Sequence, residues 1–99
     1  MPYIPDKEKY AMSAAIENLL ACIKTKGDLN YVICEVVGKL IINCDKLSYT
    51  KMSEWIDGVH DAETELRRRI LNRYEDIKII ENGDVPSFKS INDRMNGSY

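Results

Sequence analysis

A long run of helical apolar spacing between residues 49 and 82 constrains the fold of this chain more than any other feature. Its apolar residues recur at near-heptad intervals: Met52, Ile56, Val59, Leu66, Ile70, Tyr74 and Ile77. Ser48 is a suitable N-cap, and Asn82-Gly83-Asp84 is a suitable helix stop. An unbroken helix over this run, about 34 residues, would be roughly 51 Å long, whereas the two helices predicted before it would span only about 25 to 30 Å each.

Two shorter apolar runs precede it, at residues 6–25 and 28–44. One face of the first holds Ala15, Ile16, Leu19, Leu20 and Ile23, and a wide stripe of the second holds Leu29, Val32, Ile33, Val36, Val37, Leu40, Ile41 and Cys44. We expect both faces to be buried. Gly27 should end the first helix and Asp28 should cap the second. A strand is the alternative for residues 31–42, but the absence of period-two alternation favours a helix.

The predicted fold class is therefore all-α. We expect an antiparallel pair of helices packed on a long third helix, with residues 1–85 forming a single helical domain and residues 86–99 an irregular tail. Phe88, Ile91 and Met95 have helical spacing, so the alternative to a disordered tail is a short helix that docks into an apolar groove. Gly38 costs roughly 1 kcal/mol against alanine inside a helix, which suggests a close helix crossing there.

The excess length of the third helix has two explanations. The helix either bends near residues 72–74, or its later apolar residues are covered by the N-terminal segment, the tail or a second subunit. We favour a homodimer, because apolar surface that extends beyond the first two helices needs a cover. The predicted interface consists of Ile70, Leu71, Tyr74, Ile77 and Ile80.

Composition and patterning exclude several classes of function. Fourteen Lys and Arg against sixteen Asp and Glu argue against binding of bulk nucleic acid. The longest apolar segment, residues 31–44, contains Glu35 and Lys39 and is shorter than the roughly 20 residues of a membrane span. Three cysteines without C-x-x-C spacing are expected to be reduced core thiols, and residues 1–10 lack a signal-peptide pattern, so we predict a cytoplasmic protein.

No catalytic motif is present: nucleophile elbows, P-loops, dinucleotide-binding glycines and zinc spacings are all missing. We therefore predict a protein that is not an enzyme and uses no metal or cofactor. The single histidine, His60, lies one turn from Asp57 and Asp61. Together with Glu54 and Glu65 these carboxylates are more typical of a solvated helix face than of a metal site.

The strongest basic cluster consists of Arg67, Arg68, Arg69 and Arg73. We expect Glu63 to pair with Arg67 and Glu65 with Arg69, at the spacing of four residues that suits helical ion pairs. Arginines at this density can also bind a phosphate. The candidate site for an anionic metabolite or nucleotide is Arg68, Arg69, Arg73 and Tyr74.

Three stretches together resemble a family of small helical bacterial and phage proteins with no established activity. They are Met1-Pro2-Tyr3-Ile4, Gly27-Asp28-Leu29-Asn30-Tyr31, and residues 74–85, with the sequence YEDIKIIENGDV. The resemblance covers about residues 1–85, implies a helical fold and a phage or prophage origin, and assigns no catalytic residue. We predict an interaction protein that acts through self-association or a host or phage partner, the alternative being a small-ligand binder.

Overall fold

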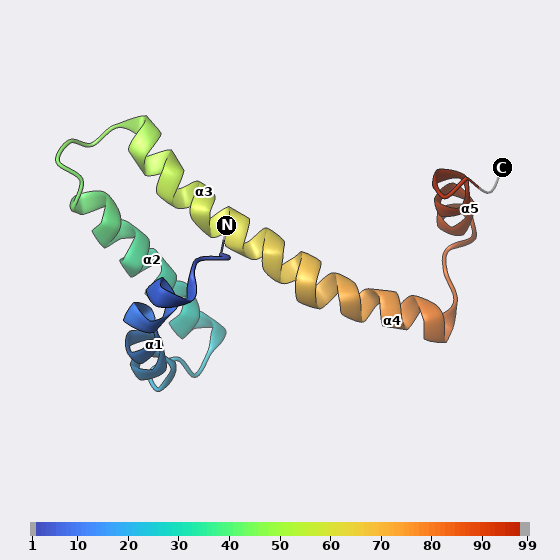
Figure 1. The fold of residues 1–99 in the computed structure, drawn as a ribbon, viewed down its shortest axis with the longest axis horizontal. Helices are drawn as coiled ribbons and strands as arrows, with labels where there is room; N and C mark the ends of the chain where they lie inside the picture. Colours follow the sequence, from blue (N-terminus) through green and yellow to red (C-terminus); the bar gives the residue numbers. More distant parts are fainter. Residues whose placement is uncertain (1, 98–99) are drawn as a thin grey trace. The chain divides into compact units, whose positions relative to one another are not determined.

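The structure is a computed structural model that describes residues 2–97, and within them every regular element is helical (Figure 1). The elements are α1 (Asp6–Leu20), α2 (Lys26–Ile42), α3 (Tyr49–Leu66), the π-helical turn η1 (Arg67–Leu71), α4 (Asn72–Asn82) and α5 (Pro86–Met95). The chain divides into two units, residues 1–62 and residues 63–99. The predicted all-α class is confirmed, and residues 31–42 are helical rather than extended.

A capping box starts α2 earlier than predicted. The hydroxyl of Thr25 accepts a hydrogen bond from the Asp28 amide at 3.1 Å, and the Asp28 carboxylate accepts one from the Thr25 amide at 3.2 Å. Thr25 is therefore the N-cap, Gly27 lies inside the first turn, and Asp28 occupies the third helical position. The predicted roles of Gly27 and Asp28 are wrong, because the reciprocal pair satisfies the amides of Thr25 and Asp28, and the Asp28 carboxylate also accepts from the Lys24 amide at 2.9 Å. The first helix correspondingly ends at Leu20.

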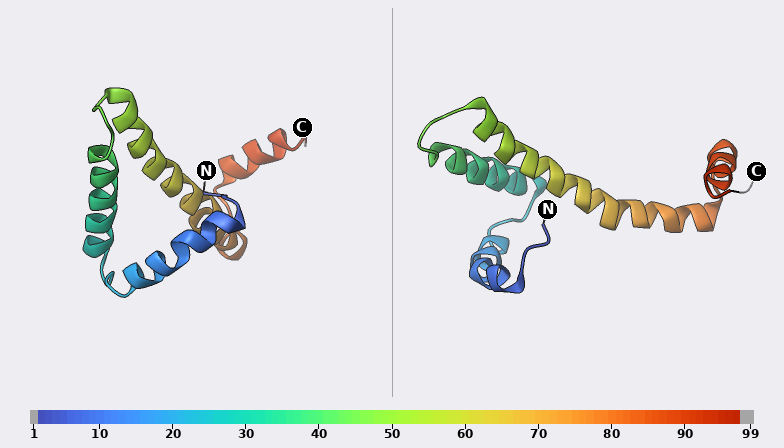
Figure 2. Two further views of the ribbon diagram at one scale, coloured as in Figure 1. Left: turned by 60° about the vertical axis from the view of Figure 1, so that its left-hand side comes forward. Right: turned by 45° about the horizontal axis from the view of Figure 1, so that its top comes forward.

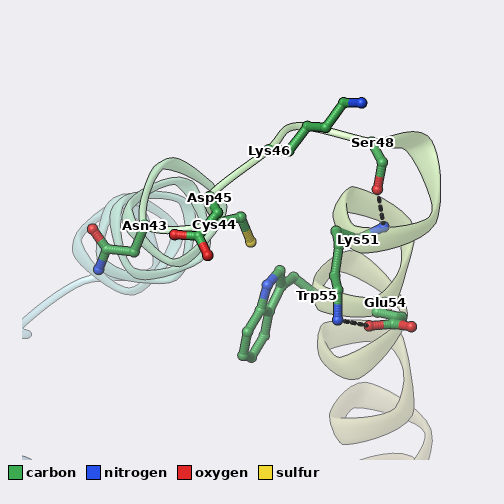
Figure 3. A pocket seen from close by; sticks show the side chains of 8 residues that line it. All are labelled: Asn43, Cys44, Asp45, Lys46, Ser48, Lys51, Glu54 and Trp55. Atoms are coloured by element: carbon green, nitrogen blue, oxygen red, sulfur yellow. Dashed lines mark hydrogen bonds and ion pairs between the residues drawn. The ribbon is translucent and has the colours of Figure 1, made fainter.

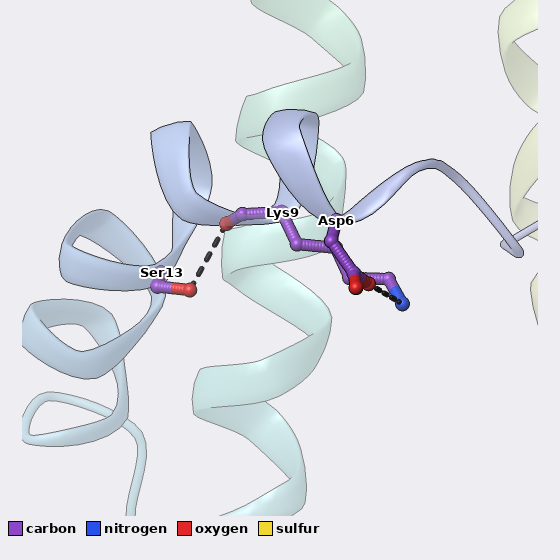
Figure 4. A network of polar contacts seen from close by, with 3 residues as sticks. All are labelled: Asp6, Lys9 and Ser13. Atoms are coloured by element: carbon purple, nitrogen blue, oxygen red, sulfur yellow. Dashed lines mark hydrogen bonds and ion pairs between the residues drawn. The ribbon is translucent and has the colours of Figure 1, made fainter.

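Local contacts hold α1. The carbonyl of Pro5 accepts from the Glu8 amide at 3.0 Å, and the ammonium of Lys9 lies 3.0 Å from the Asp6 carboxylate. The Ser13 hydroxyl donates to the Lys9 carbonyl at 2.9 Å (Figure 4). Each of these contacts joins residues three or four apart, so it stabilises the helix without fixing it to another element.

Residues 49–82 are helical without an intervening loop, which confirms the predicted long helix. The Ser48 hydroxyl accepts from the Lys51 amide at 3.2 Å, and Gly83 ends the helix with a φ of 87°, a conformation that favours glycine. The only irregularity within the run is η1, which lies just before residues 72–74, where a bend was one of the two explanations for the length of the helix. A π turn closes over five residues instead of four, so it rotates the side chains that follow relative to those that precede it.

The C-terminal segment forms the short helix that the sequence offered as an alternative to an irregular tail. Pro86 occupies the first turn of α5, where its missing amide hydrogen costs nothing. Residues 98 and 99 of the predicted tail lie outside the described residues. Among residues 2–97, no helix has the length and apolar character needed to cross a membrane.

Burial is where the structure departs most from expectation, because none of residues 2–97 is buried. On α1, Ile16 and Leu20 are exposed, and on α2 the residues Val32, Val37 and Leu40 are only half-buried. The helices of the first unit are spread apart rather than packed side by side (Figure 2). The predicted burial of these faces is wrong for a single chain, since an apolar stripe shows which side of a helix needs cover but not which chain supplies it.

The cysteines and Gly38 also lack the packing that the sequence predicted. Cys22 and Cys34 are exposed and Cys44 is half-buried, so the prediction of core thiols is wrong. A Cβ added at Gly38 would meet no atom within 4 Å among the described residues. The predicted close helix crossing is therefore absent from residues 2–97, because no other helix described there packs against Gly38.

Candidate functional site

Ion pairs within the helix occupy half of the arginine cluster. The Arg67 guanidinium lies 2.8 Å from the Glu63 carboxylate, as predicted. Arg68 forms a two-point contact with Glu65, at 2.9 and 3.0 Å. Glu65 thus pairs with Arg68 rather than with Arg69, which corrects the predicted pairing, since the residue three positions away presents both nitrogens to both carboxylate oxygens.

The other two arginines remain available. Arg69 lies in η1 and Arg73 in the first turn of α4, and neither forms an ion pair or hydrogen bond within residues 2–97. Both are exposed. The structure therefore separates the four predicted anion-binding residues: Arg68 is engaged by Glu65, while Arg69 and Arg73 present free guanidinium groups four positions apart. Glu75 and Asp76, also in α4, likewise lack an ion pair in this part of the chain.

Tyr74 has a cation as its neighbour. The Lys78 ammonium lies 5.5 Å from the centre of the Tyr74 ring and 3.0 Å from the Glu81 carboxylate. Lys78 therefore covers part of the ring, and it is the only half-buried residue of α4. A stacking ligand would have to displace it.

The predicted interface residues form an apolar surface that is exposed within residues 2–97. We call this surface the α4 face, and it consists of Ile70, Leu71, Tyr74, Ile77 and Ile80. Ile77 is 48% exposed and Ile80 is 84% exposed. Tyr74 and Ile77 are three positions apart, as are Ile77 and Ile80, so they follow one another along the helix.

The histidine-centred cluster does not assemble into a ligand set. Within residues 2–97, no group of three His, Cys, Asp or Glu side chains is placed to hold a metal ion. Glu54, which the sequence placed in the acidic stripe, lies 3.6 Å from the Lys51 ammonium, and Glu65 is the partner of Arg68.

A cavity that the sequence did not reveal lies in the first unit, between the end of α2 and the start of α3 (Figure 3). We call it the α2–α3 cavity, and its volume is ≈ 520 Å³. Its lining residues are Asn43, Cys44, Asp45, Lys46, Ser48, Lys51, Glu54 and Trp55. The Trp55 indole reaches from α3 toward the end of α2, where the Cys44 thiol points toward the opening. Nothing in the linear sequence marks this site, because Cys44 lies in the loop after α2 and Trp55 lies in α3.

Comparison with known proteins places the chain in a family without assigning a function. A family model described as Domain of unknown function (DUF6899) matches residues 1–85. No curated protein and no solved structure matches the chain significantly. The matched range ends one residue before α5 begins, and it contains all three stretches that suggested the resemblance. The chain therefore belongs to the DUF6899 family.

Proposed function

We propose that this protein is a non-enzymatic interaction protein that works by self-association, with the α4 face as its dimer interface. One observation carries the proposal: 44% of the residues are hydrophobic, yet none of residues 2–97 is buried. A monomer with so much apolar surface in water forgoes the main driving force of folding. A second chain would supply the missing cover.

A second copy fits the α4 face because it provides both apolar surface and complementary charge. A two-fold axis places the same surface opposite itself, so Tyr74 and Ile77 of one copy meet those of the other. The free cations Arg69 and Arg73 and the free anions Glu75 and Asp76 lie beside this surface on one short segment. In an antiparallel arrangement, cations of each copy come near anions of the other, which pairs charges that have no partner among the described residues of one chain.

Sedimentation equilibrium at micromolar concentration tests the proposal. We expect a dimer mass for the wild type and a monomer mass for Ile77→Asp, because a carboxylate at the centre of an apolar interface must be desolvated; the loss of affinity should be at least about 100-fold, or 2.7 kcal/mol. Circular dichroism should show that the variant keeps its helix content.

The matched control is Ile79→Asp, which makes the same change on the same helix, about 160° around it from Ile77. It should leave the dimer intact. A monomer mass for the wild type at these concentrations would contradict the proposal, and equal dissociation by both variants would contradict the choice of interface.

The cellular setting is a second part of the proposal. An odd number of cysteines, none of them in a disulfide, supports a cytoplasmic location, where thiols stay reduced. A phage or prophage origin rests on the resemblance of the sequence to its family. A host or phage protein that carries its own exposed apolar helix face is the alternative partner for the α4 face.

Anion binding is the second candidate function, and the free guanidinium groups of Arg69 and Arg73 favour it. A thermal-shift panel of nucleotides tests it, because a ligand at one hundred times its dissociation constant adds roughly 2.7 kcal/mol to the stability of the folded state. We expect any shift to disappear in Arg69→Ala and Arg73→Ala. The absence of a shift in the wild type would exclude this candidate.

A further inference from the structure

The α5 helix is too short to be stable on its own. It has ten residues, and isolated helices shorter than about 12 to 15 residues are marginal in water. Its apolar side chains Phe88, Ile91 and Met95 occupy one side of the helix and are 58%, 53% and 72% exposed. Packing of that side against another surface is what would stabilise the helix. The family match ends before α5, so this helix lies outside the matched range.

The α2–α3 cavity, in turn, lacks a cover. Its volume of ≈ 520 Å³ is within the range of about 300 to 1,000 Å³ typical of ligand sites, but it is open to solvent. Its aromatic wall, Trp55, is 40% exposed. An open cleft with an aromatic wall and a rim of polar and charged side chains is better suited to one side of a third helix than to an enclosed small molecule.

We propose that α5 of a second copy occupies the α2–α3 cavity, so that two chains exchange their C-terminal helices. The proposal rests on the proposed self-association, since its occupant is another copy of this chain. Phe88 and Ile91 would pack against Trp55, and the reciprocal arrangement would place both copies of α5 in equivalent cavities, as two-fold symmetry requires.

Charges at the cavity and on α5 agree with this occupant. Lys89 and Asp93 of α5 pair with each other at 3.1 Å, which leaves Arg94 as the charge on α5 without a partner among the described residues. At the cavity, Lys51 pairs with Glu54 at 3.6 Å, whereas Asp45 and Lys46 have no partner in the same part of the chain.

One orientation of α5 satisfies both free charges of the cavity. Arg94 lies in the last turn of α5, so an ion pair between it and Asp45 brings the C-terminal end of α5 to the loop after α2. The unsatisfied carbonyl groups at that end carry partial negative charge. Lys46, the next residue after Asp45, is then placed to interact with them.

Trp55 is the only tryptophan in the chain, so its fluorescence reports on this cavity alone. Two full-length variants each keep one side of the proposed contact. Phe88→Asp keeps Trp55 but places a carboxylate on the apolar side of α5, while Trp55→Phe is silent in tryptophan fluorescence and keeps an intact α5. Mixing them detects docking between copies, because the emission then comes only from a cavity whose own α5 cannot dock.

We expect the emission of Phe88→Asp to move to shorter wavelength, and its quenching by acrylamide to fall, when Trp55→Phe is added in excess. Trp55→Phe supplies the intact α5 in this mixture. Its matched control is the double variant Trp55→Phe with Phe88→Asp, which should produce neither change. Ser90→Asp makes the same type of substitution on the far side of α5 and should behave as wild type. Emission of Phe88→Asp that does not respond to Trp55→Phe overturns the proposal.

The remaining outcomes separate this proposal from the proposed function. If the wild type sediments as a dimer that Ile77→Asp dissociates, but mixing leaves Trp55 unchanged, the exchange of α5 is wrong and the α4 interface holds. If Phe88→Asp dissociates the dimer and Ile77→Asp does not, the exchange holds and the α4 interface is wrong. If the Trp55 emission of the wild type differs from that of Phe88→Asp by the same amount at every protein concentration, and mixing has no effect, α5 docks within its own chain. The exchange is then overturned.

Discussion

Helices α2 and α4 differ in how much of their stability the chain itself provides. In α2 a capping box fixes the start, and four apolar side chains are half-buried: Val32, Val37, Leu40 and Ile41. In α4 the only half-buried residue is Lys78, and the apolar residues Tyr74, Ile77, Ile79 and Ile80 are all exposed. Partial cover from its own chain supports α2, whereas nothing in the described chain covers the apolar side of α4.

Because of this difference, the stability of α2 and the stability of α4 should depend on different variables. Stability that comes from capping and cover within one chain is independent of protein concentration. Stability that comes from a second copy rises with concentration by mass action. The α4 face, which carries Ile77, is therefore expected to show the largest single effect, the dissociation by Ile77→Asp described above.

The next largest effect is expected from Thr25→Ala, which removes the N-cap of α2. The Asp28 amide loses its acceptor, while the Asp28 carboxylate keeps its bonds from the backbone amides of residues 24 and 25, so the free energy of unfolding should fall by about 1 kcal/mol. For a chain of this size that corresponds to roughly 4 to 8 °C in Tm.

Thermal unfolding followed by circular dichroism at several protein concentrations checks this prediction. The decrease in Tm should be the same at every concentration, because the cap belongs to one chain. Ser48→Ala is the control: Ser48 accepts a single bond, from Lys51 at 3.2 Å, so it should cost less. A decrease that grows on dilution would mean that the start of α2 is also part of the interface, which would break the distinction between α2 and α4.

The fold class and the extent of the long helix were predictable from the sequence, because both depend on local rules. Apolar spacing fixed residues 49–82 as helix, and Ser48 and Gly83 mark its ends through a hydroxyl acceptor and a left-handed backbone. The start of α2 was misjudged because Thr25 lies before the apolar run. The T-x-x-D signal was nevertheless present, since Thr25 and Asp28 have the spacing of a capping box.

What the sequence could not give is the set of contacts between distant residues. Periodicity shows that Ile16 or Val36 belongs to an apolar side, but exposure depends on whether another helix arrives there. The α2–α3 cavity likewise needs Cys44, in the loop after α2, and Trp55, in α3, to be brought together. For the candidate site, spacing alone also allowed Glu65 to pair with either Arg68 or Arg69, and the side-chain geometry selects Arg68.

The smallest expected effect concerns Gly38, and it tests whether α2 depends on its own chain alone. A Cβ at this position meets nothing within 4 Å, so Gly38→Ala should raise the free energy of unfolding by about 0.5 to 1 kcal/mol through the lower backbone entropy of the unfolded chain. Gly58 in α3 is equally open, and Gly58→Ala is therefore the matched control. Urea unfolding measures both. If Gly58→Ala stabilises the chain while Gly38→Ala destabilises it or weakens association, a second chain approaches the α2 backbone closely, and α2 depends on a partner as α4 does.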